Sequence, residues 1–422
     1  MNRFYFLSFY FLFLSCSSRV EKSTENLTDN EAIVIDTIVK EEPLYCNADV
    51  VVGSANINLY LDLLKDKKVG IVGNQSSMIY DTHLVDSLKS LGVNVVKVFS
   101  PEHGFRGDAD AGEKVVSGKD EKTGLPIISL YGSNKKPTAE QLADIDVLLF
   151  DIQDVGARFY TYISTLHYVM QAAAENRKKL IVLDRPNPNG HYVDGPVLNP
   201  KFSSFVGMHA IPVVHGMTTG EYAQMINGEG WLGSGLVCDL QVIKCTGWDH
   251  TKYYELPIAP SPNLKNMTAI YLYPSLCFFE GTVVSVGRGT DYPFQVIGHP
   301  KFEVDVLEKL YKFTPTPNAA AENPVLKGQI CYGYDLHETD VKEYRKNAKL
   351  DLSYLLEFYK KLKMGSAFFL KSNFINNLAG TDQLKAQIIS GKSLEEIEAT
   401  WQEGLIKFKE IRKKYLLYTD FE

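Results

Sequence analysis

The 422-residue sequence predicts an α/β protein with a mostly parallel sheet domain followed by a smaller α+β domain. Between residues 67 and 185, short segments that are apolar throughout alternate with amphipathic stretches, and this alternation ends after Trp231. Strands that are apolar on both faces and are separated by helices indicate a parallel sheet covered by helices on both sides. The chain is also too long for one ordinary hydrophobic core.

The first domain, residues 46–231, has the pattern of a Rossmann-like fold. The longest helix predicted in this domain, 160–176, carries Ile163, Leu166 and Met170 at three- and four-residue steps. The other predicted helices cover 81–91 and 138–143. The predicted strands are KKVGIVGN (67–74), VNVVKVFS (93–100), LPIISLYG (125–132), IDVLLFDI (145–152) and KKLIVLDR (178–185).

The second domain, residues 232–422, is predicted to mix strands and helices. Residues 236–248, LVCDLQVIKCTGW, alternate like a strand with one exposed face. Helices are expected at 303–313, 351–362 and 393–415, the last beginning at a capping Ser393 with an acidic first turn. Residues 314–324, TPTPNAAAENP, are expected to form a loop.

The N-terminal residues predict export and lipidation. Arg3 precedes an apolar segment, 4–14, which is too short to span a bilayer but has the length of a secretory signal. The pair Ser15-Cys16 resembles a lipoprotein processing site, so residues 1–16 are predicted to be a signal peptide and Cys16 to carry the lipid. The polar residues 17–45 are expected to tether the body to a bacterial membrane, on its periplasmic or cell-surface side.

Composition and missing motifs exclude several classes of function. The formal net charge is −7 and no long Lys/Arg block is present, so we expect no nucleic-acid partner. GxGxxG after the first strand, GxxxxGK[ST] and HExxH are all absent, and the six cysteines include no CxxC pair. We therefore expect no cofactor and no metal site. The oligomeric state does not follow from the sequence.

Polar residues follow four of the predicted strands. Ligands of open parallel sheets bind outside the carboxyl ends of the strands, where loops converge and helix N-termini point. These ends therefore predict one site. The residues are Asn74 and Gln75 after the first strand, Glu102, His103 and Arg106 after the second, Asp151, Asp154, Arg158, Tyr160 and Tyr162 after the fourth, and Asp184 and Asn187 after the fifth.

A set of ordered motifs resembles the NamZ (YbbC-like) family of exo-acting β-N-acetylmuramidases. The motifs span residues 60–418 and include SPEHGFRGDADAGE, FDIQDVGARFYTYISTL, DRPNPNG, PVVHGMTTGEYAQMINGEGWL, PSPNL and YPSLCFFEGTVVSVGRGT. The last motif has Val286 where an acidic residue is expected, so no carboxylate acts at that position. The resemblance implies release of N-acetylmuramic acid from the non-reducing end of peptidoglycan fragments, in cell-wall turnover or salvage, at a site between the two domains.

Hydrolysis of a β-glycosidic bond needs a proton donor and a group that stabilises or traps an oxocarbenium-like carbon. Glu102 is the expected general acid, because a partly buried carboxyl tends to keep its proton. Cationic His103 and Arg106 would favour its ionised form, which leaves a role as base or nucleophile open. The second group is Glu280, Asp151 or Asp154. Alternatively the substrate's own acetamido group attacks, oriented by Tyr160, Asp154 or Asn187.

Selection of muramic acid requires a cation for its lactyl carboxylate, and a planar guanidinium suits that role. Arg106, Arg158 and Arg288 are the candidates. Sugar hydroxyls are expected to meet Asn74, Gln75, His215 and Asn263, and sugar rings to stack on Tyr160, Tyr162 or Trp248.

One alternative remains from a different class, a non-catalytic lipoprotein that binds muropeptides. A binding protein needs amides, Arg and aromatic side chains, but it does not need carboxylates such as Glu102 and Glu280.

Overall fold

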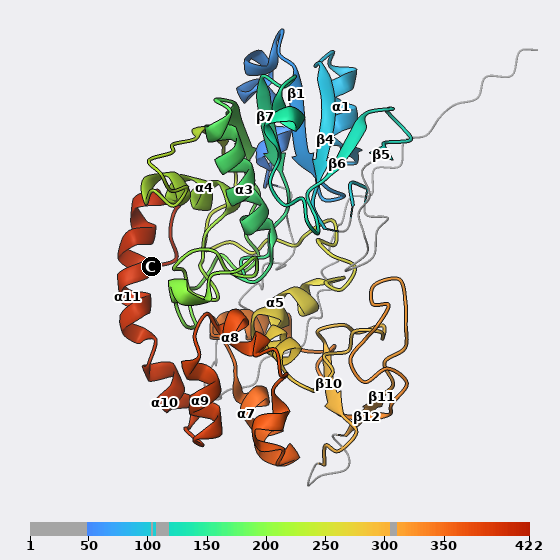
Figure 1. Ribbon diagram of the computed structural model, residues 1–422, viewed down its shortest axis with the longest axis vertical. Helices are drawn as coiled ribbons and strands as arrows, with labels where there is room; N and C mark the ends of the chain where they lie inside the picture. The colour runs from blue at the N-terminus through green and yellow to red at the C-terminus, as the bar shows by residue number, and fades with distance from the viewer. Residues whose placement is uncertain (1–48, 103, 107–117, 304–309) are drawn as a thin grey trace, which may run out of the picture. The chain divides into compact units, whose positions relative to one another are not determined.

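In the computed structural model, the described residues are 49–102, 104–106, 118–303 and 310–422 (Figure 1). The predicted signal peptide with Cys16, the predicted tether and His103 lie outside them.

The main element is a seven-stranded sheet, and all of its strand pairs are parallel except β5 with β6. Its parallel strands have the spatial order 3-2-1-4-5-6 of the Rossmann fold, which confirms the predicted fold class. The strands, in spatial order, are β5 (Gly118–Lys119), β6 (Pro126–Ser129), β4 (Val95–Ser100), β1 (Val69–Gly73), β7 (Val147–Asp151), β8 (Lys179–Leu183) and β9 (Asp239–Ile243).

The side chains of successive strand residues point to opposite faces of this sheet. Ile71 packs in the core cluster that contains α1 (Leu84–Ser90), whereas Val72 packs in the cluster that contains α3 (Tyr162–Glu175) and α4 (Thr219–Gly228). This alternation follows from the two-residue repeat of a strand. It explains why the central strands are apolar throughout. The short α2 (Ala139–Leu142) also packs on the α3 side, through Leu142.

The edge strand β9 comes from the segment that alternates in sequence, residues 236–248. It lies beside β8, with Ile181 opposite Gln241, and its burial is only partial except at Ile243. An edge strand is covered less completely than a central one, which accounts for its mixed pattern. The sheet therefore ends one strand beyond the predicted domain boundary at residue 231.

The following segment contains helices and a small antiparallel sheet, as predicted. The sheet has the order β10 (Val296–His299), β12 (Cys331–Asp335) and β11 (Tyr311–Phe313). The helices are α5 (Met267–Leu276), which continues into the 3-10 helix η5 (Cys277–Gly281), and α6 (Val341–Asn347), α7 (Ser353–Leu362), α8 (Phe374–Ala379), α9 (Gln383–Ile389), α10 (Leu394–Ala399) and α11 (Gln402–Arg412).

Two predicted helices differ from the structure. Residues 311–313 of the predicted helix 303–313 form strand β11, and residues 304–309 lie outside the described residues. The predicted helix 393–415 is two helices, because the chain breaks between α10 and α11, where Trp401 donates its indole N–H to Asp194 Oδ1 at 3.2 Å. Ile397 and Leu405 are buried in the core on either side of the break, so the spacing of apolar residues is that of one continuous helix.

The C-terminal residues return to the first domain, where α11 lies near α4 (Figure 1). Arg412 donates to the Gly216 carbonyl and Tyr418 donates to Asp184 Oδ2 at 2.7 Å. Both parts of the described chain thus share one hydrophobic core, which runs in sequence from Val72 to Phe408. Of the helices in the described ranges, none is both long and apolar enough to cross a bilayer.

Candidate active site

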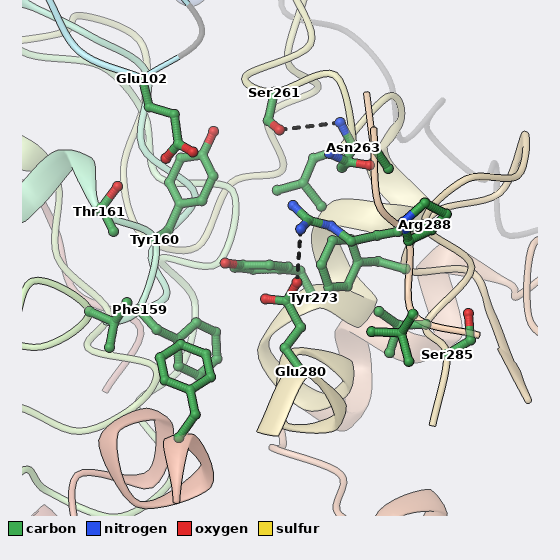
Figure 2. A pocket seen from close by; sticks show the side chains of 18 of the residues that line it. Glu102, Phe159, Tyr160, Thr161, Ser261, Asn263, Tyr273, Glu280, Ser285 and Arg288 are labelled. Atoms are coloured by element: carbon green, nitrogen blue, oxygen red, sulfur yellow. Dashed lines mark hydrogen bonds and ion pairs between the residues drawn. The ribbon is translucent and has the colours of Figure 1, made fainter. Parts of the chain in front are cut away.

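A pocket of about 570 Å³ is lined by residues from both parts of the chain. Its volume is in the range of small-molecule sites, roughly 300–1,000 Å³. Figure 2 shows Glu102 and Tyr160 on one side of the pocket and Asn263 and Arg288 on the other, with Glu280 below Arg288.

Glu102 is brought to the pocket by the end of strand β4. Its Oε1 accepts a hydrogen bond of 3.0 Å from the Tyr131 hydroxyl. Tyr131 follows β6, the parallel neighbour of β4, so the two strand ends meet at the same edge of the sheet. Burial and the nearby Glu102 raise the pKa of Tyr131 to about 12, so the phenol remains a hydrogen-bond donor at neutral pH.

Glu280 reaches the pocket from η5, directly after α5. Its Oε1 lies 3.2 Å from Arg288 Nη1, and its Oε2 accepts a weak hydrogen bond from Cys277 Sγ at 3.5 Å. The Glu280 carboxylate raises the pKa of Arg288, which therefore stays cationic. Burial raises the pKa of Cys277 well above its usual value, so this residue is a neutral thiol donor rather than a nucleophile.

Arg288 lies between two glycines with left-handed backbone, Gly287 at φ 76° and Gly289 at φ 81°. Its guanidinium carbon lies 5.8 Å from the centre of the Phe294 ring, within cation–π range. Its Nε is buried and has no hydrogen-bond partner among the described residues. The guanidinium can thus donate to a further group in the pocket.

A loop that precedes α5 is attached to the sheet domain at the carbonyls of Ala259 and Pro260, of which that of Pro260 accepts more hydrogen bonds. The Pro260 oxygen accepts hydrogen bonds from the hydroxyls of Tyr160 at 2.8 Å and Tyr162 at 3.3 Å, and from Gln75 Nε2 at 3.1 Å. Burial raises the pKa values of both tyrosines, so they act as neutral donors. Their contacts hold in place the next residues of the loop, which include Ser261 in the pocket lining.

Asn263 lines the pocket from the same loop and is 1% exposed. Its Nδ2 donates to the Ala320 carbonyl at 2.8 Å, whereas its Oδ1 has no partner among the described residues. The amide is therefore oriented, with an acceptor available for a ligand.

Comparisons with known proteins agree with this architecture. Residues 69–268 match the family model described as exo-beta-N-acetylmuramidase NamZ, N-terminal, and residues 271–418 match the corresponding C-terminal model. The chain belongs to the NamZ family. The resemblance and the glycoside hydrolase class expected from the sequence are confirmed.

Three individual relatives extend this result. The peptidoglycan beta-N-acetylmuramidase NamZ of Bacillus subtilis (strain 168) is 40% identical over 375 residues, which are 85% of this chain and 89% of that protein. Two crystal structures of DUF1343 family proteins from Bacteroides fragilis NCTC 9343 are also similar. One has 47% identity and a TM-score of 0.81, covering 88% of this chain and all of that chain; the other has 30% identity and a TM-score of 0.74, covering 88% and 99%.

In this NamZ family member, only part of the predicted site lines the pocket. The predicted residues found there are Glu102, Tyr160, Tyr162, Asn263, Glu280 and Arg288. The remaining predicted residues of the described chain form internal contacts instead, each with an identifiable structural role.

Two of the three candidate arginines are not in the pocket. Arg158 is fully buried and donates to the carbonyls of Pro196, Ile211 and Leu378 at 2.7 to 2.8 Å. Arg106 forms ion pairs with Asp86 and Asp120, the closest at 2.7 Å. Both guanidiniums are therefore occupied by the fold, which leaves Arg288 as the predicted arginine that faces the pocket.

The predicted aspartates at the ends of β7 and β8 are also internal. Asp151 is fully buried and holds Arg185 with both carboxylate oxygens, at 2.6 and 2.9 Å. Asp184 accepts hydrogen bonds from Thr218, the Gly220 backbone and Tyr418. Because these carboxylates satisfy buried donors, they are not free to meet a sugar, and the candidate roles of Asp151 in catalysis and Asp184 in binding are corrected.

Asp154 lies behind the pocket rather than in it. Its Oδ1 accepts a hydrogen bond of 2.7 Å from the Gly156 backbone, and its Oδ2 is buried with no partner among the described residues. Burial raises its pKa to about 7. It does not line the pocket, so the structure does not support it as the second catalytic group.

The remaining predicted polar residues support loops. Asn187 donates to the Met217 carbonyl, Asn74 accepts from Ser76, and Gln75 acts through the Pro260 carbonyl rather than on a ligand. His215 is buried, accepts from the Met217 backbone, and has a pKa lowered to about 3 by burial. Trp248 is buried and meets Tyr418 edge to face. None of these residues lines the pocket.

The residues that act at the site but were not predicted include Tyr131, Cys277 and the pocket residues Ala321–Val325. Tyr131 is the penultimate residue of the third predicted strand, 125–132, so the rule that ligands bind at the carboxyl ends of parallel strands also applies to it. No sequence pattern predicts the role of Cys277, because its contact with Glu280 depends on the turn that η5 makes. Within the described ranges, no group of three or more His, Cys, Asp or Glu side chains is arranged to hold a metal ion.

Proposed function

We propose that this protein releases N-acetylmuramic acid from the non-reducing end of peptidoglycan fragments, with Glu102 and Glu280 as its two catalytic carboxylates. The observation that carries this assignment is that carboxylates from both family segments line the same pocket, Glu102 from the first segment and Glu280 from the second. The name of the B. subtilis relative supports the substrate class.

Their different partners suggest different roles for the two carboxylates. Glu102 is hydrogen-bonded by a neutral phenol, which is compatible with a group that must carry a proton to the leaving oxygen. Glu280 faces a guanidinium, which suits a group that must be negatively charged when positive charge develops at the anomeric carbon. We therefore assign Glu102 as general acid and Glu280 as nucleophile or electrostatic stabiliser.

Arg288 is the proposed partner of the lactyl carboxylate, the group that distinguishes muramic acid from glucosamine. The side chain is 36% exposed, stays cationic and has an unpartnered Nε. A guanidinium can engage a carboxylate with two parallel hydrogen bonds while another of its nitrogens faces Glu280.

A chromogenic N-acetylmuramide tests this function. The wild type is expected to hydrolyse it, and Glu102→Gln and Glu280→Gln are each expected to lose activity by roughly a thousandfold. The exposed Glu140→Gln is a matched control that keeps full activity. Calorimetric binding of N-acetylmuramic acid by a wild type that shows no turnover would instead support a capture protein.

We also propose that the protein is exported and held at a bacterial membrane by a lipid on Cys16. The sequence of residues 1–16 supports this, and an enzyme of this substrate class is expected to act next to its polymer. Cys16→Ser is expected to move the protein from the detergent phase to the aqueous phase when cells that express it are fractionated. An unchanged distribution would contradict lipidation.

A further inference from the structure

The loop at residues 314–325 contributes to the pocket, although its composition predicts only a connection. It is the first part of the connection between β11 and β12, and its second half lines the pocket through Ala321, Glu322, Asn323, Pro324 and Val325. The segment expected only to connect two elements is thus part of the pocket wall.

This wall is attached at several points. Asn318 and Ala321 exchange backbone hydrogen bonds of 3.1 and 3.0 Å, which close a tight turn. The Thr316 N–H donates to the Gly289 carbonyl at 2.9 Å, and a Cβ built on Gly289 would lie 2.5 Å from the Thr316 carbonyl oxygen. This close approach requires glycine beside Arg288, so the wall is packed directly against the residue proposed to bind the lactyl group.

A third attachment comes from the loop that precedes α5. Asn263 donates to the Ala320 carbonyl at 2.8 Å, so it connects the wall to the loop that Tyr160 and Tyr162 hold at Pro260. The polar atoms in this link are buried, where a hydrogen bond is hard to replace with water. The wall is therefore fixed by both parts of the chain.

The wall stands opposite the proposed general acid. Figure 2 shows Asn263, to which the wall is attached, on the far side of the pocket from Glu102. The carbons C1 and C4 are at opposite ends of a pyranose ring. A sugar that presents its C1 oxygen to Glu102 therefore directs C4 toward Asn263 and the wall, and its C3 lactyl group toward the neighbouring Arg288.

We propose that residues 314–325 are the element that makes this enzyme exo-acting, because they exclude any sugar attached to C4 of the bound muramic acid. The exclusion is steric: the wall occupies the space into which the glycan would continue. This inference rests on the proposed function, since it assumes that Glu102 lies at the cleaved bond.

Two soluble glycans test the exclusion. One ends in N-acetylmuramic acid at its non-reducing end, and the other carries one further N-acetylglucosamine on C4 of that residue. The first variant replaces Asn318–Asn323 with two glycines. The second keeps the length of the loop and combines Glu322→Gly, Asn323→Gly and Val325→Ala. The matched control combines Lys327→Ala and Gln329→Ala, which are exposed in the same connection but do not line the pocket.

The wild type and the control are expected to cleave only the uncapped glycan. In either wall variant that folds, as judged by its thermal unfolding, the rate on the capped glycan relative to the uncapped one should rise by roughly tenfold or more. An unchanged ratio in a folded wall variant would overturn the inference, as would cleavage of the capped glycan by the wild type. A wild type inactive on both glycans would refute the proposed function itself.

Discussion

Arg288 Nη1 lies 3.2 Å from Glu280 Oε1, and both side chains are partly exposed in the pocket. One guanidinium is thereby placed to serve two purposes, orientation of a proposed catalytic carboxylate and recognition of an anionic substrate group. The two purposes can be separated by comparison of substrates that differ only in the lactyl group.

Arg288→Ala is expected to lower kcat/KM for a muramic acid substrate by about 100-fold, but by only about tenfold for the glucosamine analogue. Both substrates lose the contact that orients Glu280, but only the first also loses a carboxylate partner. Parallel assays on the two substrates measure the ratio. Arg106→Ala serves as control because the ion pairs of Arg106 lie outside the pocket. Equal losses of kcat/KM on both substrates for Arg288→Ala would rule out recognition of the lactyl group by Arg288.

Tyr131→Phe is expected to lower kcat by about tenfold with little change in KM, because it removes the hydrogen bond that orients Glu102 and leaves the ring in place. Steady-state kinetics and thermal unfolding of the variant check this. The exposed Tyr80→Phe should change neither constant. If KM rose and kcat stayed constant, Tyr131 would contact the substrate rather than position the general acid.

Arg158→Met is expected to reduce the free energy of unfolding by about 3 kcal/mol or more, because three buried carbonyls lose their donor. Urea unfolding, followed by tryptophan fluorescence, measures this loss. The exposed Lys201→Met should change stability by less than about 0.5 kcal/mol. Wild-type stability with selective loss of activity on muramic acid would instead restore Arg158 as a binding residue.

Asp154→Asn is expected to stabilise the protein at alkaline pH relative to the wild type. Burial raises the pKa of Asp154 from 3.8 to about 7, so the folded protein binds a proton there that the unfolded chain releases between these values. The contribution of this group to wild-type stability is complete below pH 3.8 and is lost as the pH rises through 7.

The asparagine variant does not titrate at this position. The difference in unfolding free energy, variant minus wild type, should therefore grow by roughly 2–4 kcal/mol between pH 4 and pH 8. Urea unfolding across this range measures the trend, with the exposed Asp239→Asn as control. A difference that is constant with pH would show that Asp154 is ionised in the folded protein throughout.

Some of the side chains predicted near strand ends line the pocket, and others do not. Glu102 and Tyr160 are separated from their strands by at least one residue and reach the pocket. Asp151, by contrast, is the last residue of β7 and is buried under the loops that build the pocket. Its charge satisfies Arg185, which would otherwise be an unpaired buried cation.

Distance from the strand does not decide this outcome, since Arg158 lies well beyond the end of β7 and is also internal. A guanidinium near a strand end is predicted to bind a substrate carboxylate, but the backbone carbonyls of the loops there also need hydrogen-bond donors. Arg158 supplies three such bonds, to carbonyls that lie 38, 53 and 220 residues away in sequence. No local sequence pattern shows whether an arginine binds a substrate carboxylate or donates to backbone carbonyls of the fold.

The sequence was sufficient to predict the mostly parallel sheet, the family and the presence of a carboxylate after β4, because apolar repeats and motifs are local properties of the chain. The tertiary structure alone decided which polar side chains face the pocket, and it brought Tyr131, Cys277 and residues 321–325 to the same place as Glu102, Glu280 and Arg288. The physical reason is that a buried polar side chain must satisfy whatever donor or acceptor lies next to it, and those neighbours come from segments distant in sequence.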